Sequence, residues 1–295
     1  MNLLRPRFLA SGRIRFAVVV ACVGAAAIAC RPLTLFNAFV PKDDGSLLVV
    51  RDAKYGPEAR QTLDVYRPRD PGKFPLPVII FFYGGSWNSG TKQGYAFVGR
   101  ALASRGFIVA IPDYRLVPQV RYPVFLEDCA AAVRWVHVHA SELGGDPDRL
   151  VLAGHSAGAY NGAMLAYDPR WLGPEQRTIK GFVGLAGPYD FLPFDGPITR
   201  EAFLGTANAA STQPVNFASR GDPPAFLATG TQDRFVRPAN SDALAARLRR
   251  VETPVVRRSY PGIGHVGILT AIARPLRGRA AVLDDISAFA HGVSR

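Results

Sequence analysis

The residues with the clearest chemical potential form the pentapeptide Gly154-His155-Ser156-Ala157-Gly158, which has the pattern Gly-x-Ser-x-Gly. An apolar run at 150–153 leads into it, and small residues that begin a helical pattern follow it. This layout is typical of a nucleophile elbow, a tight turn between a strand and a helix that projects a serine hydroxyl above the end of a sheet. The two glycines let neighbouring chain approach the turn closely. The pattern predicts that Ser156 is a nucleophile.

A serine hydroxyl becomes nucleophilic when a histidine accepts its proton and an acid orients that histidine. In proteins built around such an elbow, both partners follow the serine, with the acid first, on loops after later strands. Asp233 follows an expected strand at 225–229, and His265 follows the last expected strand at 255–260. We therefore expect Asp233 and His265 to complete a catalytic triad with Ser156.

The other four histidines are less well placed to act as the base. His137 and His139 lie in an expected helix before the serine, and His291 lies in the C-terminal helix. His155 is inside the elbow, where we expect its side chain to point away from the nucleophile. The base is therefore assigned to His265.

The acid has three alternatives, since an aspartate after a strand is often only a turn residue. They are Asp190, Asp195 and Asp222. Asp190 follows the preceding expected strand, at 181–186, where some hydrolases carry the acid. We favour Asp233 and leave these three open.

The same chemistry needs preorganised N–H donors for the charge that develops on the substrate oxygen. The backbone N–H of Ala157, directly after the nucleophile, is one expected donor. The loop Gly84-Gly85-Ser86-Trp87 follows a buried strand at 78–82, and its paired glycines let backbone N–H groups turn into the site. We expect the other donors in this loop.

Expected strands and helices alternate along the chain. The strands are at 47–52, 61–66, 78–82, 107–111, 150–153, 181–186, 225–229 and 255–260. The helices are at 92–105, 123–143, 157–167, 239–251 and 280–291. The first two strands alternate apolar and polar residues, as half-buried antiparallel strands do. The whole pattern predicts an α/β class, with a mostly parallel central sheet, helices on both faces and one domain over 31–295.

The composition argues against several other classes of protein. The chain has 295 residues, 48% of them apolar, which is ample for a large core. The formal net charge is +12, but five arginines before residue 32 leave +7 spread over the rest, so no nucleic-acid arm is expected. The cysteines are Cys22, Cys30 and Cys129, which gives no disulfide framework. We expect no metal and no cofactor.

Residues 1–30 have the features of a signal peptide. Four arginines precede Phe16–Ala29, an uncharged apolar stretch of 14 residues that is short for a membrane span. The end of the stretch, Ala27-Ile28-Ala29-Cys30, resembles a bacterial lipobox, although leucine is usual at its first position. We expect export to the bacterial cell envelope, with Cys30 as a lipidation candidate that attaches the protein to the membrane. Ordinary cleavage, an uncleaved anchor and a misassigned start codon remain alternatives.

Residues from about 45 to 290 resemble the α/β-hydrolase superfamily, in its branch of carboxylesterases, hormone-sensitive-lipase-like proteins and kynurenine-formamidase-like proteins. Besides the elbow, the resemblance rests on the motifs at 113–118 (Asp-Tyr-Arg-Leu-Val-Pro), at 122–123 (Tyr-Pro) with Asp128 and Trp135 downstream, and at 145–149 (Gly-Asp-Pro-Asp-Arg).

The resemblance implies an α/β-hydrolase fold with a short lid insertion. It places two oxyanion donors at Gly85 and Ser86, since the family motif His-Gly-Gly-Gly or His-Gly-Gly-x-Trp aligns with residues 83–87. Tyr83 departs from that motif, because the family has a histidine there that is thought to brace the loop. The departure weakens any claim to one particular activity within the family.

The expected function is hydrolysis of small carboxylic esters through an acyl-enzyme. Residues 189–222 are irregular and would form the lid, which favours a short acyl group. Four side chains in it could line an acyl pocket or pack the lid to the core: Phe191, Leu192, Phe194 and Phe203. Two alternatives stay open, an arylformamidase, which the Gly-Gly-x-Trp loop would also suit, and a non-catalytic envelope-anchored binding protein.

Overall fold

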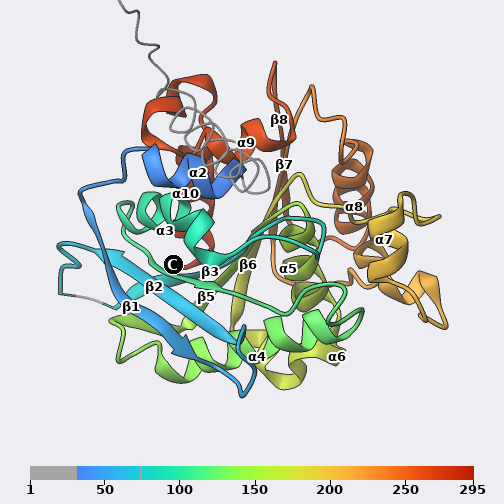
Figure 1. The fold of residues 1–295 in the computed structure, drawn as a ribbon, viewed down its shortest axis with the longest axis horizontal. Helices are drawn as coiled ribbons and strands as arrows, with labels where there is room; N and C mark the ends of the chain where they lie inside the picture. The colour runs from blue at the N-terminus through green and yellow to red at the C-terminus, as the bar shows by residue number, and fades with distance from the viewer. Residues whose placement is uncertain (1–31, 74) are drawn as a thin grey trace, which may run out of the picture.

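The computed structural model describes residues 32–73 and 75–295 of the chain (Figure 1). The expected signal peptide at 1–30 and its lipidation candidate Cys30 lie outside the described residues. Within the described part of the chain, no helix is both long enough and apolar enough to cross a bilayer.

Eight strands form one sheet in the order β1-β2-β4-β3-β5-β6-β7-β8. They are β1 (Ser46–Lys54), β2 (Thr62–Pro68), β3 (Leu76–Phe82), β4 (Ile108–Pro112), β5 (Gly145–His155), β6 (Ile179–Leu185), β7 (Ala225–Gly230) and β8 (Val255–Tyr260). β2 runs antiparallel to both of its neighbours, β1 and β4, and every other pair is parallel. This mostly parallel sheet confirms the predicted fold class.

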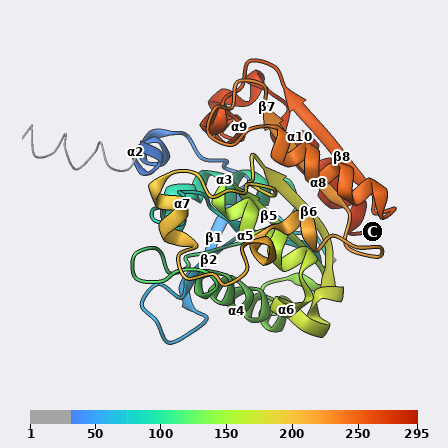
Figure 2. The ribbon, with the colours of Figure 1, turned by 90° about the vertical axis from the view of Figure 1, so that its right-hand side faces the viewer.

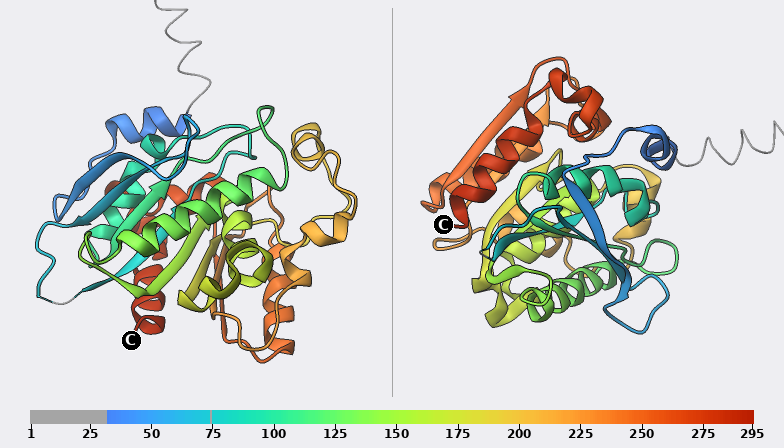
Figure 3. Two further views of the ribbon diagram at one scale, coloured as in Figure 1. Left: turned by 90° about the horizontal axis from the view of Figure 1, so that it is seen from below. Right: turned by 90° about the vertical axis from the view of Figure 1, so that its left-hand side faces the viewer.

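Helices cover both faces of the sheet. The α-helices are α2 (Pro32–Phe39), α3 (Ala96–Ala103), α4 (Val124–His139), α5 (Ala157–Tyr167), α6 (Pro169–Leu172), α7 (Pro197–Ala202), α8 (Ala239–Arg250), α9 (His265–Thr270) and α10 (Val282–Val293). The 3-10 turns are η1 (Lys92–Tyr95), η2 (Gly173–Thr178), η3 (Ala209–Thr212), η4 (Pro214–Asn216) and η5 (Arg274–Arg279). α3 and α10 pack together on one face, and α4, α5 and α6 pack on the other (Figure 2). The view from the left-hand side shows α10, in red, and α4, in green, on opposite sides of the sheet (Figure 3).

The sequence pattern explains why the central strands are buried. β3, β4 and the second half of β5 contain almost only apolar residues and are buried along their length, as strands covered on both faces must be. β1 at the edge has a mixed pattern of burial, which matches its polar residues. The buried apolar side chains form one continuous core around the sheet.

Several elements differ from the sequence-based expectation. β5 begins at Gly145 instead of 150, α4 ends at His139 instead of 143, and α6 was not expected. The helix expected at 92–105 is divided into η1 and α3. α2 and α9 were not expected, because α2 is short and mostly apolar, without a clear helical period, and α9 follows glycines that indicated a loop. Residues 189–222, in yellow to orange in Figure 1, hold only the short elements α7, η3 and η4, of which η4 contacts α8.

Candidate active site

The register of the parallel strands brings the loops of the site together at one edge of the sheet. Phe82 at the end of β3 lies opposite Gly154 near the end of β5, so the glycine-rich loop after β3 is next to the elbow. Gly230 at the end of β7 lies opposite Tyr260 at the end of β8, so the two later loops are neighbours as well. Carboxyl ends of parallel strands are the usual position of a site in open α/β sheets.

Ser156 occupies the turn between β5 and α5, with φ 55° and ψ −123°. A non-glycine residue with positive φ is strained, and such strain is concentrated at functional turns. Neither glycine of the pentapeptide has a positive φ, so backbone conformation does not explain why glycine is needed there. The reason is the lack of space for a side chain. A Cβ at Gly158 would lie 2.0 Å from the carbonyl oxygen of Phe82, and one at Gly154 would lie 2.4 Å from the backbone of Gly158. The expected close approach at the elbow is confirmed.

Ser156, His265 and Asp233 form a chain of hydrogen bonds. The Ser156 Oγ lies 2.9 Å from His265 Nε2, and His265 Nδ1 lies 2.8 Å from Asp233 Oδ2. The tautomer that satisfies both contacts carries its proton on Nδ1, so Nε2 is free to accept the proton of the serine. The structure thus places the three side chains at the distances that serine activation requires.

The other carboxylate oxygen of Asp233 is held by backbone. Oδ1 accepts hydrogen bonds from the N–H groups of Phe235 (2.9 Å) and Val236 (3.0 Å). Burial by itself would raise the pKa of Asp233, but the hydrogen bond and charge of His265, helped by these two N–H groups, lower the pKa below its ordinary value. Asp233 is therefore an ionised, fixed partner for His265.

None of the three alternative acids contacts His265, whose carboxylate partner is Asp233. Asp195 accepts a hydrogen bond from the N–H of Gly196, and Asp222 accepts one from the N–H of Ser219. Asp190 is exposed at the mouth of the pocket described below.

Among residues 32–73 and 75–295, no group of three or more His, Cys, Asp or Glu side chains could hold a metal ion.

His155 lies against His265, a contact that the sequence analysis did not predict. Its Nε2 is 2.9 Å from the carbonyl oxygen of His265, and the two ring centroids are 4.8 Å apart. Burial, and next the charge of His265, lower the pKa of His155 to about 3. A neutral ring then donates from Nε2 and fixes the backbone of the residue that carries the base.

The loop after β3 has an unusual backbone. Gly85, Ser86 and Trp87 have φ values of 122°, 51° and 60°. A Cβ at Gly84 would lie 2.9 Å from the Ser156 Cβ, so the loop passes directly over the elbow. The backbone N–H groups of Gly85 and Ser86 have no acceptor among the described residues, and both residues line the same pocket as Ala157. These N–H groups can therefore donate hydrogen bonds to a bound ligand.

Tyr83, at the base of this loop, is fixed on every side. Its hydroxyl donates to Asp113 Oδ1 (2.6 Å) and accepts from Arg60 Nη2 (2.7 Å). Its ring stacks between those of Tyr95 and Tyr114, at centroid distances of 5.2 and 4.9 Å. The buried tyrosine therefore occupies the place of the family histidine with its own set of partners.

The partners of Tyr83 also hold the loop backbone. Tyr114 donates its hydroxyl to the carbonyl of Tyr83 (2.8 Å), and Tyr95 donates to the carbonyl of Gly84 (3.3 Å). Arg60 donates to the carbonyl of Gly90, at the far end of the loop (3.0 Å). Because both ends of the loop are tied to one network, its N–H groups are preorganised.

Ser156 opens into a pocket of about 900 Å³. Of the four lid side chains considered from the sequence, three line this pocket, and they are Phe191, Leu192 and Phe194. Phe203 is buried beneath them and stacks on Phe194 at 4.9 Å, so it packs the lid to the core. The sequence analysis missed Phe235, whose ring centroid is 5.6 Å from that of His265. Its position two residues after Asp233 was the only available signal.

The chain is similar in sequence to several known proteins. The BD-FAE family model matches residues 63–248. The chain is 30% identical over 239 residues to Esterase LipC of Mycobacterium tuberculosis, which covers 73% of this chain and 59% of that protein. It is 31% identical over 267 residues to the probable isoprenylcysteine alpha-carbonyl methylesterase ICME of Oryza sativa subsp. japonica, which covers 82% of this chain and 64% of that protein. The chain thus spans less than two thirds of the length of both relatives.

A solved structure confirms the fold. An inhibited esterase B from Lactobacillus rhamnosis superimposes with a TM-score of 0.78, over 94% of this chain and 97% of that one. The two sequences are 20% identical, so the likeness concerns the fold alone. The predicted α/β-hydrolase architecture is therefore confirmed.

Proposed function

Because the chain belongs to the BD-FAE family, we propose that it is a serine esterase that hydrolyses carboxylic esters through an acyl-enzyme. The observation that carries the proposal is the hydrogen-bonded chain from Asp233 through His265 to Ser156, which opens into the pocket. The names of the relatives support it, since they are an esterase and a methylesterase.

The first half of the reaction forms the acyl-enzyme. The Ser156 Oγ attacks the ester carbonyl carbon while His265 Nε2 takes its proton, and Asp233 stabilises the imidazolium that results. The N–H groups of Ala157, Gly85 and Ser86 donate to the carbonyl oxygen as it becomes negatively charged. His265 then gives its proton to the leaving alcohol, and the C–O bond breaks.

The second half hydrolyses the acyl-enzyme and regenerates the free enzyme. A water molecule loses a proton to His265 and attacks the acyl carbon, and the same three N–H groups hold the second tetrahedral intermediate. His265 returns the proton to the Ser156 Oγ as the carboxylic acid leaves. None of these steps requires a cofactor.

The acyl group is proposed to be small, from acetyl to butyryl. The support is the short lid, whose Phe191 and Phe194 close one side of the pocket. Initial rates on p-nitrophenyl esters from acetyl to dodecanoyl test the proposal. We expect the highest kcat/KM at about four carbons or fewer, because a short lid can cover only part of a long acyl chain. A maximum at decanoyl or longer would contradict the proposal.

One observation favours a second candidate, an arylformamidase. The loop at 84–87 keeps the Gly-Gly-x-Trp pattern, and the proposed machinery would act equally on an N-formyl group. Rates on an aryl formamide and on the matching aryl acetate distinguish the two activities. A higher kcat/KM for the formamide would replace the esterase proposal.

Replacement of Ser156 tests the proposed activity. Ser156→Ala should lower kcat on p-nitrophenyl acetate by about three orders of magnitude or more, because the loss of a triad member removes covalent catalysis. The control is Ser141→Ala, at an exposed serine after α4, and both variants should melt within about 2 °C of the parent, since neither change alters core packing. Retained hydrolysis in folded Ser156→Ala would refute the proposal.

Export and lipidation of the N-terminus are also proposed, and their support is the sequence of residues 1–30. Metabolic labelling with a fatty acid in a bacterial host should label the full chain and leave Cys30→Ser unlabelled. Cys22→Ser is the matched control, since that cysteine lies inside the apolar stretch. Equal labelling of parent and Cys30→Ser would contradict lipidation at Cys30.

A further inference from the structure

Helix α2 exposes large apolar side chains, and its two polar residues are Thr34 and Asn37. Its sequence, Pro-Leu-Thr-Leu-Phe-Asn-Ala-Phe, has no charged residue. Phe36 faces inward and packs edge-on against Phe97 of α3, with ring centroids 5.3 Å apart. Leu35, Ala38 and Phe39 face outward, and Phe39 is 80% exposed. A helix on the surface of a globular protein normally presents polar residues outward. The outward side of α2 mainly presents Leu35, Ala38 and Phe39 instead.

The body of the protein holds α2 firmly. Asn37 Nδ2 donates to the carbonyl of Gln93 in η1 (2.7 Å), and Asn37 Oδ1 accepts from the N–H of Phe97 in α3 (3.0 Å). These bonds and the contact between Phe36 and Phe97 fix both the position and the rotation of the helix. Its exposed apolar side chains are therefore a permanent part of the surface.

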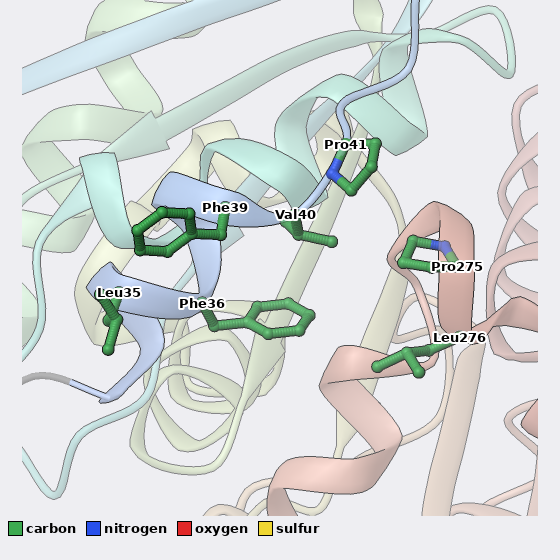
Figure 4. Close-up of a pocket in the computed structure, with 7 residues that line it drawn as sticks. All are labelled: Leu35, Phe36, Phe39, Val40, Pro41, Pro275 and Leu276. Carbon is green, nitrogen blue, oxygen red and sulfur yellow. The ribbon is translucent and has the colours of Figure 1, made fainter.

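An apolar groove of about 500 Å³ runs between α2 and η5. Figure 4 shows Phe36 and Leu276 on its two sides. The groove is lined by Leu35, Phe36, Phe39, Val40, Pro41, Pro275 and Leu276. All seven side chains are apolar, so a group bound in the groove would bury apolar surface and make no hydrogen bonds to these side chains.

The apolar surface continues to the mouth of the active-site pocket. Leu33, in the first turn of α2, lines that pocket. The rim carries four exposed apolar side chains, Leu192, Ile198, Phe235 and Val266, of which Phe235 is 84% exposed. α2 and α7 lie on the same side of the molecule (Figure 2). We call the outward side chains of α2 together with these four rim residues the apolar face.

The chain that precedes α2 indicates what covers this face. α2 begins at Pro32, two residues after the lipidation candidate Cys30 and three after the apolar stretch Phe16–Ala29. Any attachment of that segment to a membrane brings α2 to the lipid surface before the rest of the protein.

The charges beside the groove indicate whether apolar burial or electrostatic attraction would hold the apolar face on a lipid surface. Arg274 pairs with Asp44 (2.9 Å), and Arg277 pairs with Asp43 (2.7 Å). The pocket rim adds two exposed arginines, Arg200 and Arg237, and two exposed aspartates, Asp190 and Asp195. Because these charges balance, we expect apolar burial to be the main source of binding energy and attraction to anionic lipid to be a minor one.

We propose that the apolar face docks on the surface of a lipid bilayer, with Leu35 and Phe39 inserted at the interface and the pocket mouth facing the lipid. An ester that resides at the bilayer interface then reaches Ser156 without crossing bulk water. This consequence for the substrate rests on the proposed esterase function, whereas the docking does not.

Fluorescence quenching tests the docking directly. The full-length protein is bound to phosphatidylcholine vesicles that contain brominated lipid, as the parent, as Phe39→Trp and as Val138→Trp. Val138 is a matched control, because it is 73% exposed on α4, away from α2 (Figure 1). We expect the added fluorescence of Phe39→Trp to be quenched and that of Val138→Trp to persist. An unquenched Phe39→Trp, or equal quenching of the two, would overturn the proposal.

A second pair of variants tests the consequence for the substrate. Phe39→Asp should lower hydrolysis of a vesicle-embedded short-acyl ester about tenfold or more, since burial of one large apolar side chain is worth at least that factor in affinity. Its rate on a water-soluble ester should match the parent, and Val138→Asp should match the parent on both esters. A Phe39→Asp variant equal to the parent on the embedded ester would contradict delivery from the lipid.

The outcomes separate the two proposals and the other occupants of the face. A parent that hydrolyses neither ester refutes the esterase function, and the quenching result then decides the docking alone. Quenching that requires phosphatidylglycerol would overturn the apolar basis of the proposal. A dimer in sedimentation that Phe39→Asp converts to a monomer, with Phe39→Trp shielded from lipid, would assign the face to a second copy of the chain instead.

Discussion

Replacement of His155 by glutamine should reduce the loss of folding stability that occurs as the pH falls. His155 is buried, and its Nε2 donates to the carbonyl of His265 at 2.9 Å. Burial, and next the charge of His265, lower its pKa from 6.5 to about 3. The folded protein therefore keeps this ring neutral in a pH range where the unfolded chain binds a proton.

The sign and size of the effect follow from that difference. Between pH 6.5 and about 3 the unfolded state binds more protons at this position, so stability falls as the pH falls. The contribution of the neutral ring is fully present above pH 6.5 and is lost progressively through this window. From about pH 7 to pH 5 the loss is about 2 kcal/mol, since each unit below the unfolded pKa costs about 1.4 kcal/mol. For a domain of this size that corresponds to about 4–8 °C in Tm.

Calorimetry on the parent and on His155→Gln measures the effect. Glutamine can still donate to the His265 carbonyl but does not titrate, so its Tm should fall less between pH 7 and pH 5, by about the amount above. His137→Gln, at a partly exposed position on α4, controls for the loss of any one histidine. Equal falls in Tm for the parent and His155→Gln would refute the reasoning.

Three further substitutions test the elements around the site. Tyr83→Phe removes the hydroxyl between Arg60 and Asp113 but keeps the ring stack, so kcat on a short ester should fall about tenfold or more with little change in KM. A larger change in KM than in kcat would contradict a role in holding the oxyanion loop. Gly158→Ala places a Cβ 2.0 Å from the Phe82 carbonyl oxygen and should cost more than about 3 kcal/mol in urea unfolding, and an unchanged midpoint would contradict this. Asp233→Asn should lower kcat at neutral pH by about three to four orders of magnitude, and a rate within tenfold of the parent would show that another acid serves His265.

The elements that position the site could be predicted because each has a local sequence signal. Apolar runs indicated the buried strands, and the glycines at 154 and 158 indicated the elbow, where the structure leaves no room for a side chain. The order of Asp233 and His265 after the serine followed from the alternation of strands and helices. These signals depend only on neighbouring residues and on the periodicity of the sheet.

Contacts between distant loops could not be predicted in this way. His155 and His265 meet across 110 positions of sequence, through the packing of the elbow against the loop after β8. The sequence showed that Tyr83 replaces the family histidine, but its partners Arg60 and Asp113 lie 23 and 30 positions away. α2 escaped prediction because it is a short, mostly apolar helix of eight residues, too short to show a clear helical period.

Labelling with a fluorophosphonate tests the central proposal most directly, because such a probe forms a covalent bond with an activated serine. The full-length protein is treated with the probe, and its intact mass and peptides are measured. We expect a single adduct on Ser156 that is absent from Ser156→Ala and forms far more slowly in His265→Ala. An adduct at another residue, or an unlabelled Ser156 in protein that still hydrolyses esters, would contradict the proposed mechanism.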